Sequence, residues 1–123
     1  MNIFRAACVI AAFSAIGLLA AGCDLDNHGS RKHNPPDGYG ALVVENNSSR
    51  DIRVYIDGKE AGKVSDYSNR PFDLLPGVHR IILDERHGDR SWRDDVDIIE
   101  ARLTILDVSS GWDNDFDVRV FFD

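Results

Sequence analysis

Three aspartates at alternate positions, Asp113, Asp115 and Asp117, offer the carboxylate oxygens that a calcium ion prefers. A calcium loop with ligands at every second position also needs a glycine at its sixth position, where this chain has Val118. The three aspartates are therefore candidate metal ligands without the complete motif. The alternative interpretation is a solvated loop that runs into a strand, in which Asp117 points outward and Phe116 inward.

A second acidic cluster contains Asp94, Asp95 and Asp97. A glycosidase needs two carboxylates at a defined separation across a cleft, one of them with a raised pKa. The sequence indicates neither a cleft nor a desolvated carboxylate. It also contains no Gly-x-Ser-x-Gly, no phosphate-binding glycine loop and no His-Glu-x-x-His. We therefore predict a protein that is not an enzyme and has no catalytic residues.

Two further side chains have binding chemistry. Trp112 lies between Gly111 and Asp113, and a large aromatic residue in such a loop can contact a sugar or a partner protein. Packing of Trp112 over the end of the domain is the alternative. His79 follows a Pro-Gly turn at the start of an apolar stretch, where we expect it to stabilise the turn.

Cys23 has the most specific chemical context in the chain. It follows an N-terminal segment with a positive charge at Arg5 and sixteen uncharged residues from Ala6 to Ala21. This layout, closed by small residues, is typical of a secretory signal peptide. A membrane-spanning helix needs about 20 predominantly apolar residues, so the segment is too short to remain as a span.

The run Leu19-Ala20-Ala21-Gly22-Cys23 resembles the lipobox of bacterial lipoproteins. The resemblance implies that residues 1–22 are removed and that the Cys23 thiol carries a covalent lipid, with no other cofactor. It also implies a membrane-anchored protein of the bacterial cell envelope that faces the periplasm. Asp24 resembles the sorting signal that keeps enterobacterial lipoproteins in the inner membrane. The alternative is an ordinary signal peptide in which Cys23 is incidental.

Composition limits what the mature chain can be. Removal of residues 1–22 leaves 101 residues, enough for one domain. The whole chain has 14 basic and 21 acidic residues and a net charge of −7, which argues against a nucleic-acid partner. Of the two cysteines, Cys8 would be removed and Cys23 acylated, so the mature domain would have no disulfide.

Residues 23–40 are predicted to form the lipidated N-terminus and a flexible linker. The stretch contains Pro35, Pro36 and three glycines but few apolar residues. It cannot bury enough apolar surface to offset the entropy lost on ordering. The linker would let the following domain stand away from the membrane.

From residue 41 onward the hydrophobic period becomes two, which indicates β-strands. Apolar residues alternate with polar ones at 41–45, 52–57, 92–98 and 116–122. Asp94 interrupts the third stretch and predicts a bulge or a bend there. Residues 78–83 and 103–108 carry apolar side chains on both parities and are expected to be central strands covered on both faces.

Turn signals separate these stretches at intervals of about ten residues, including 46–49, 57–58, 76–77, 87–89 and 109–111. Asp57-Gly58 has the composition of a type I′ hairpin turn. With no helical stripe, the pattern predicts an all-β fold, a small immunoglobulin-like β-sandwich over residues 41–123.

Two segments of this domain resemble a known module. The hairpin VYIDGK at 54–59 and the strand entry LLPGVHRIIL at 74–83 are similar to the PEGA domain, a small immunoglobulin-like β-sandwich of bacterial and archaeal envelope proteins. The resemblance covers about residues 40–108. It implies no catalytic activity, and a binding or spacing role.

Together these features predict a non-enzymatic, membrane-anchored envelope lipoprotein. Its sandwich would bind a protein or glycan partner or act as a spacer. The alternative function is a calcium-binding or calcium-regulated β module that uses the loop from Asp113 to Asp117.

Overall fold

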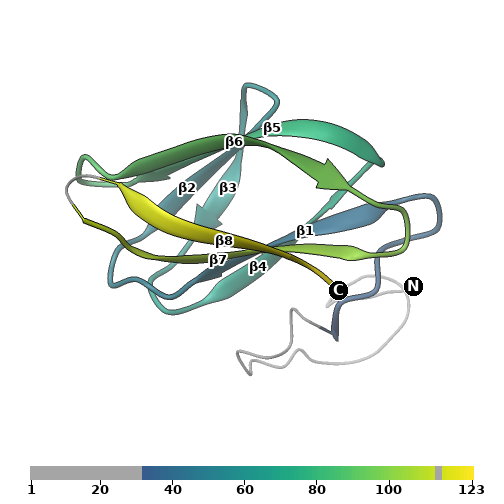
Figure 1. Cartoon of the computed structure of the whole chain (residues 1–123), viewed down its shortest axis with the longest axis horizontal. Helices are drawn as coiled ribbons and strands as arrows, with labels where there is room; N and C mark the ends of the chain where they lie inside the picture. Colours follow the sequence, from purple (N-terminus) through teal and green to yellow (C-terminus); the bar gives the residue numbers. More distant parts are fainter. Residues whose placement is uncertain (1–31, 113–114) are drawn as a thin grey trace.

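The computed structural model describes residues 32–112 and 115–123, which form eight β-strands in two layers (Figure 1). The strands are β1 (Gly40–Asn46), β2 (Ile52–Ile56), β3 (Lys59–Val64), β4 (Asn69–Leu74), β5 (Gly77–Glu85), β6 (Ser91–Ile98), β7 (Leu103–Ser110) and β8 (Phe116–Phe122). The predicted all-β sandwich is confirmed. In the described part of the chain, no helix is long and apolar enough to cross a membrane.

The first sheet has the strand order β4-β1-β7-β8, and the second has the order β3-β2-β5-β6. Strand β1 is central in the first sheet, antiparallel to β4 and parallel to β7. All other pairs of neighbouring strands are antiparallel. The edge strands β6 and β8 belong to different sheets and lie along the same side of the sandwich (Figure 1).

The core lies between the sheets, where the alternating apolar residues meet. Its buried members are Leu42, Val44, Ile52, Val54, Val64, Phe72, Ile81, Leu83, Val96, Ile98, Leu106, Val108 and Phe116. Burying one such side chain contributes about 1.5–3 kcal/mol, so this cluster is the main source of stability. Trp92 packs against the cluster while partly exposed.

The two strands predicted to be covered on both faces differ from each other. On β7 the prediction is confirmed, because Leu106 and Val108 face the core while Leu103 and Ile105 belong to a second buried cluster on the outer face. On β5 it is wrong. Val78 is 67% exposed on the outer face of the second sheet, which no strand among the described residues covers.

The predicted irregularity at Asp94 is also absent. Asp94 pairs with Ile81 in an unbroken register between β5 and β6. It occupies a position of inward parity but is exposed, which is possible because β6 is an edge strand. The register shift of the second sheet lies instead between β2 and β3, where Ala61 is the extra residue.

The predicted hairpin turn at Asp57-Gly58 connects β2 to β3. Asp57 has φ +53° and Gly58 has φ +87°, the positive values that this turn requires. The sharp reversal places Asp57 against β5, where its Oδ1 accepts a hydrogen bond of 2.9 Å from the backbone N–H of Arg80.

The last residues of the predicted linker contact the sandwich. His33 Nε2 lies 2.7 Å from Asp73 Oδ1, on the outer face of β4. The backbone N–H of Ala101 donates to the carbonyl of Tyr39 at 2.9 Å. Residues 32–39 therefore run along the domain before the chain enters β1.

Candidate binding surface

Trp112 lies in the loop between β7 and β8 and is 92% exposed. Packing of this side chain over the end of the sandwich, one of the two interpretations of the sequence, is therefore wrong. The loop is short and closed by backbone hydrogen bonds from Gly111 N to Asp115 O at 3.1 Å and from Asp115 N to Trp112 O at 3.4 Å. An indole on such a loop presents most of its surface for contact with a partner.

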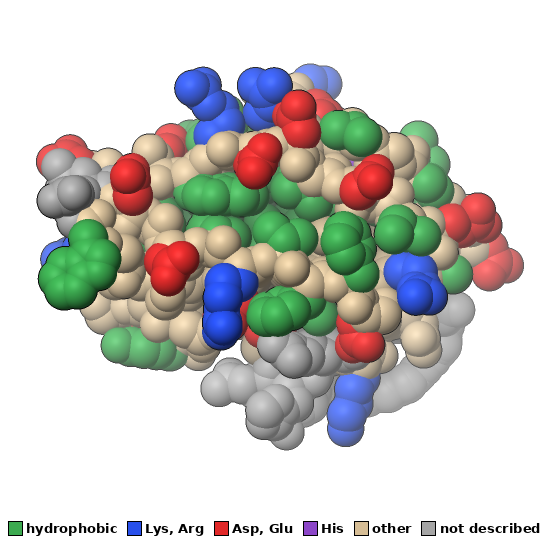
Figure 2. Space-filling view, in the orientation of Figure 1, with side chains coloured by type: hydrophobic (Ala, Val, Ile, Leu, Met, Phe, Trp, Pro, Cys, Tyr) green, Lys and Arg blue, Asp and Glu red, His purple; other side chains and the backbone are tan. Residues whose placement is uncertain are grey.

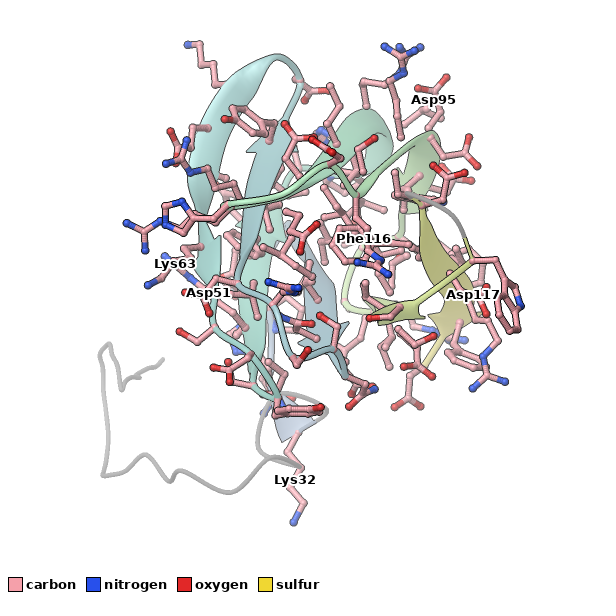
Figure 3. All side chains as sticks on the ribbon, turned by 90° about the vertical axis from the view of Figure 1, so that its left-hand side faces the viewer. Lys32, Asp51, Lys63, Asp95, Phe116 and Asp117 are labelled. Carbon is pink, nitrogen blue, oxygen red and sulfur yellow. The ribbon has the colours of Figure 1, made fainter. Side chains whose placement is uncertain are left out.

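The candidate calcium ligands do not form a site within the described residues. Asp115 is exposed, and Asp117 points away from the core while its neighbour Phe116 points inward, as expected for successive strand residues (Figure 3). Asp113 lies outside the described residues. In the part of the chain that the structure describes, no three His, Cys, Asp or Glu side chains are grouped to hold a metal ion.

The acidic cluster on β6 consists of surface groups. Asp95 forms an ion pair with Arg80 on β5, and the hydrogen bond from this guanidinium lowers the pKa of the Asp95 carboxyl. Asp94 Oδ1 accepts a hydrogen bond of 2.8 Å from the backbone N–H of Asp95. A general acid requires the opposite pKa shift, produced by desolvation.

His79 has the structural role expected from the sequence. Its Nδ1 lies 2.6 Å from Asp57 Oδ2, and its Nε2 lies 2.7 Å from the carbonyl oxygen of Leu75. Partial burial lowers the pKa of His79, but the hydrogen bonds to Leu75 and Asp57 outweigh this effect and raise the pKa overall. The hydrogen bond with His79 also lowers the pKa of Asp57. The ring therefore ties the β2–β3 turn to the start of β5.

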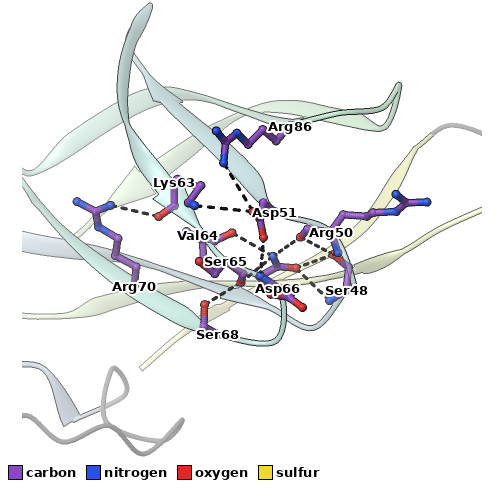
Figure 4. Close-up of polar contacts among 11 residues, drawn as sticks. Ser48, Arg50, Asp51, Lys63, Val64, Ser65, Asp66, Ser68, Arg70 and Arg86 are labelled. Atoms are coloured by element: carbon purple, nitrogen blue, oxygen red, sulfur yellow. Dashed lines mark hydrogen bonds and ion pairs between the residues drawn. The ribbon is translucent and has the colours of Figure 1, made fainter.

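A buried polar network joins the β1–β2 connection to the β3–β4 connection (Figure 4). At its centre Asn46, 1% exposed, donates from Nδ2 to the carbonyls of Arg50 at 2.7 Å, Val64 at 3.2 Å and Ser65 at 3.1 Å. Its Oδ1 accepts from the N–H and hydroxyl of Ser48 at 3.0 and 2.7 Å. These bonds all satisfy backbone or neighbouring groups, so we assign the network a structural role.

Asp51 extends this network to the surface. Its Oδ2 lies 3.7 Å from Lys63 Nζ and 3.9 Å from Arg86 Nη1, and its Oδ1 accepts from the N–H of Asp66 at 3.1 Å (Figure 4). The carboxylate thus links the β2, β3 and β5 ends. Its partners are all provided by the chain itself.

A surface that the sequence analysis did not identify lies between the edges of β6 and β8. One end is closed by the bridge between Ser91 and Asp115 and by the buried ring of Phe116. Beyond it, the inward-parity residues of β8 become exposed, with Val120 at 43% and Phe122 at 54%. Beside the Ser91–Asp115 bridge, the surface has a shallow hollow, lined by Ile82, Asp84, Ser91, Trp92, Arg93, Asp115 and Phe116.

Figure 2 shows apolar side chains in a band across this side of the molecule, with carboxylates on either side of it. We use the name β6–β8 groove for the partly buried or exposed apolar residues of inward parity along these two edges: Trp92, Val118, Val120 and Phe122. The signal in the sequence was the run Val120-Phe121-Phe122, which is apolar on both parities at the end of a strand.

Cys23 and Asp24, the predicted lipidation and sorting residues, lie outside the described residues. The sites that the structure does describe are therefore the exposed indole of Trp112 and the β6–β8 groove. Trp112 precedes β8, and the groove follows the strand to Phe122, at its other end.

Comparison with known proteins bears on the fold. No family model matches the chain, and no curated protein matches it. Among solved structures, it is similar to the N-terminal domain of AlgF from P. aeruginosa, with 15% identity and a TM-score of 0.50 over 69% of this chain and 95% of that one. At this identity the similarity concerns the β fold alone.

Proposed function

We propose that the chain is a non-enzymatic lipoprotein of the bacterial cell envelope, anchored by a lipid on Cys23. Its β-sandwich, a PEGA-like module, faces the periplasm and binds a protein or glycan partner or acts as a spacer. The observation that carries the proposal is the position of Cys23 directly after a short apolar segment that ends in small residues.

The described domain is consistent with this role. Trp112 is 92% exposed on a loop held by backbone hydrogen bonds, which suits a contact residue better than a core residue. Residues 32–39 lie along the sandwich, so the tether to the membrane would begin on the N-terminal side of residue 32.

Acylation is tested by expressing the full chain in an enterobacterial host with labelled palmitate. The Cys23→Ala variant is expected to lose the label and to leave the membrane fraction or remain unprocessed. The matched control is Cys8→Ala, because Cys8 lies in the segment predicted to be removed and its variant should label normally. Label and membrane association that persist in Cys23→Ala would refute the anchor.

The sorting role of Asp24 has a separate test. The wild-type chain is expected in the inner-membrane fraction of a density gradient, and Asp24→Ser is expected to move toward the outer membrane. If the two proteins sediment together in the outer-membrane fraction, Asp24 is not a retention signal in this chain. The lipid anchor would be unaffected by that result.

The role of Trp112 is tested by crosslinking in intact cells followed by purification of the chain. Trp112→Ala is expected to lose a crosslinked partner that the wild-type chain retains. A Tyr67→Ala variant is the matched control, because Tyr67 is also a large exposed aromatic residue, at 60%, on a different loop. A partner that is retained in both variants would exclude Trp112 from the contact.

A further inference from the structure

The four edges of the sandwich are not equivalent. Natural edge strands are protected from pairing with other chains by bulges, prolines or inward-pointing charges. Strand β3 has the extra residue Ala61, β4 contains Pro71, and β6 carries Asp94 at an inward position. In the second half of β8, Val120 to Phe122, none of these devices is present.

The backbone of β8 has free hydrogen-bonding groups on the same residues. Leu103 and Asp123 exchange two backbone hydrogen bonds, of 2.9 and 3.1 Å, across the β7–β8 pair. Because bonded and non-bonded pairs alternate in an antiparallel ladder, Val118, Val120 and Phe122 direct their N–H and C=O groups away from β7. Among the described residues no strand pairs with this edge.

The apolar side chains of these residues also lack a complete cover. Phe116 is 4% exposed, but exposure rises along the strand to 43% at Val120 and 54% at Phe122. In Figure 1 the β8 ribbon moves away from β6 toward the C-terminus, and Figure 2 shows the apolar band over that space. One extended segment beside β8 would pair with its free backbone and insert alternate side chains into the groove.

The charges beside the groove define the partner. Asp115, directly before β8, and Asp117 on β8 are exposed carboxylates of outward parity, on the face to which every second side chain of an added strand would point. The nearest cation on β8, Arg119, is already paired with Asp107 at 3.0 Å. A second copy of this chain would add its own net charge of −7, which opposes association, whereas basic side chains would be attracted.

We propose that the free edge of β8 binds an extended peptide segment of another protein, in which apolar residues alternate with basic ones. The segment adds as a fifth strand to the first sheet. Its apolar side chains cover Val118, Val120 and Phe122, and its basic side chains lie on the opposite face, near Asp115 and Asp117. The inference names the partner class for the proposed binding role, but it does not depend on the lipid anchor.

The probe is a fluorescein-labelled nine-residue peptide of alternating lysine and valine, titrated with the full chain in mild detergent and followed by fluorescence anisotropy. Saturable binding is expected. A peptide with serine in place of valine and one with glutamate in place of lysine should each bind at least tenfold more weakly. If the lysine-serine peptide bound as tightly as the lysine-valine peptide, binding would come from charge attraction alone and the proposal would be overturned.

Two variants locate the site. Val120→Pro removes an N–H that faces away from β7, as Pro71 does at the β4 edge, and is expected to weaken binding at least tenfold. Phe121→Ala is the matched control, because Phe121 is on the same strand and 41% exposed but has the opposite parity, and it should change binding less than threefold. Urea unfolding of both variants verifies that they are folded.

Amide hydrogen exchange distinguishes strand addition from contact of side chains alone. The lysine-valine peptide should slow exchange at Val118, Val120 and Phe122. Binding without this protection, or binding that Val120→Pro leaves unchanged, would refute strand addition at β8. A dimer in sedimentation experiments that Val120→Pro disrupts would identify a second copy as the occupant and also refute the proposal. Failure of the palmitate experiment would leave this test unaffected.

Discussion

Asn46 provides a quantitative test of the structure, because a single buried side chain connects two loops. Asn46→Ala would remove a side-chain amide whose two N–H groups are shared among three carbonyl oxygens and whose own oxygen accepts two hydrogen bonds. Each hydrogen bond contributes about 0.5–1.5 kcal/mol net, and buried groups left unpaired cost about 1–3 kcal/mol. We therefore expect a loss of about 3 kcal/mol in the free energy of unfolding, a substantial part of the ~5–15 kcal/mol of a typical domain.

The assay is urea unfolding followed by tryptophan fluorescence, with Trp92, packed against the core, as the reporter. Ser48→Ala removes one hydroxyl from the same network and should cost about 1 kcal/mol. Asn46→Asp keeps the acceptor but loses both donors and places a charge beside the carbonyls of Val64 and Ser65. It should be at least as unstable as Asn46→Ala at neutral pH.

Two results would refute this reasoning. One is a loss below about 1 kcal/mol in Asn46→Ala, since a well-bonded buried amide cannot be removed at that cost. The other is an equal loss in Asn46→Ala and Ser48→Ala, which would mean that the donations to the second loop contribute nothing. Either result would place the Asn46 amide in water rather than between the two loops.

The remaining predictions concern the turn, the exposed loop and the carboxylates. Folding raises the pKa of His79, so the stabilisation from His79 is present below pH ~6.5 and is lost as the pH rises through the folded-state pKa. Folding lowers the pKa of Asp57, so the stabilisation from Asp57 is lost as the pH falls below ~4. The melting temperature should therefore fall from pH 6 to pH 9 in the wild type and less in His79→Gln; equal falls would refute this linkage. Gly58→Ala should lower the free energy of unfolding by about 1–2 kcal/mol, because alanine is strained at φ +87°. The new methyl group would contact no other atom, so backbone strain is the whole effect. An unchanged midpoint of urea unfolding would contradict the turn geometry. Trp112→Ala should change stability by less than about 0.5 kcal/mol, and a larger loss would mean that the indole packs on the domain. The melting temperature should be the same in EDTA and in calcium, because no three acidic, His or Cys side chains among the described residues are grouped to hold a metal ion, and a chelator-dependent shift would revive the calcium site.

The sequence predicts the strands well because each buries one face and the alternation is therefore explicit. It fails where apolar residues have another cause. On the outer face of β5, Val78 is exposed and Ile82 is half-buried, and β-branched side chains there favour the strand conformation without being fully covered. Asp94 interrupts the pattern of β6 because the strand is at an edge, and a polar residue on the inward parity indicates an edge as well as a bulge.

The arrangement of the sheets is not encoded locally. Turn signals such as Asp57-Gly58 predict which strands are neighbours in a hairpin, but nothing near residues 40–46 identifies β4 and β7 as the partners of β1. The β6–β8 groove is hidden for the same reason, since it requires that two strands distant in the sequence end on one side. For Trp112 the sequence left two interpretations open, and only the position of the loop excluded packing.

The central position of β1 also sets the order in which the domain can fold. The second sheet contains two local hairpins, β2–β3 and β5–β6, which can form while the rest of the chain is still extended. Strand β1 pairs with β4 and β7, so its pairing is complete only when residues 103–110 are available. If residues 40–123 became available for folding in order from the N-terminal end, β1 would stay unpaired on one side until residues 103–110 followed. During that interval Ala41 and Val43 would be exposed, which makes the early, incomplete chain a natural substrate for chaperones.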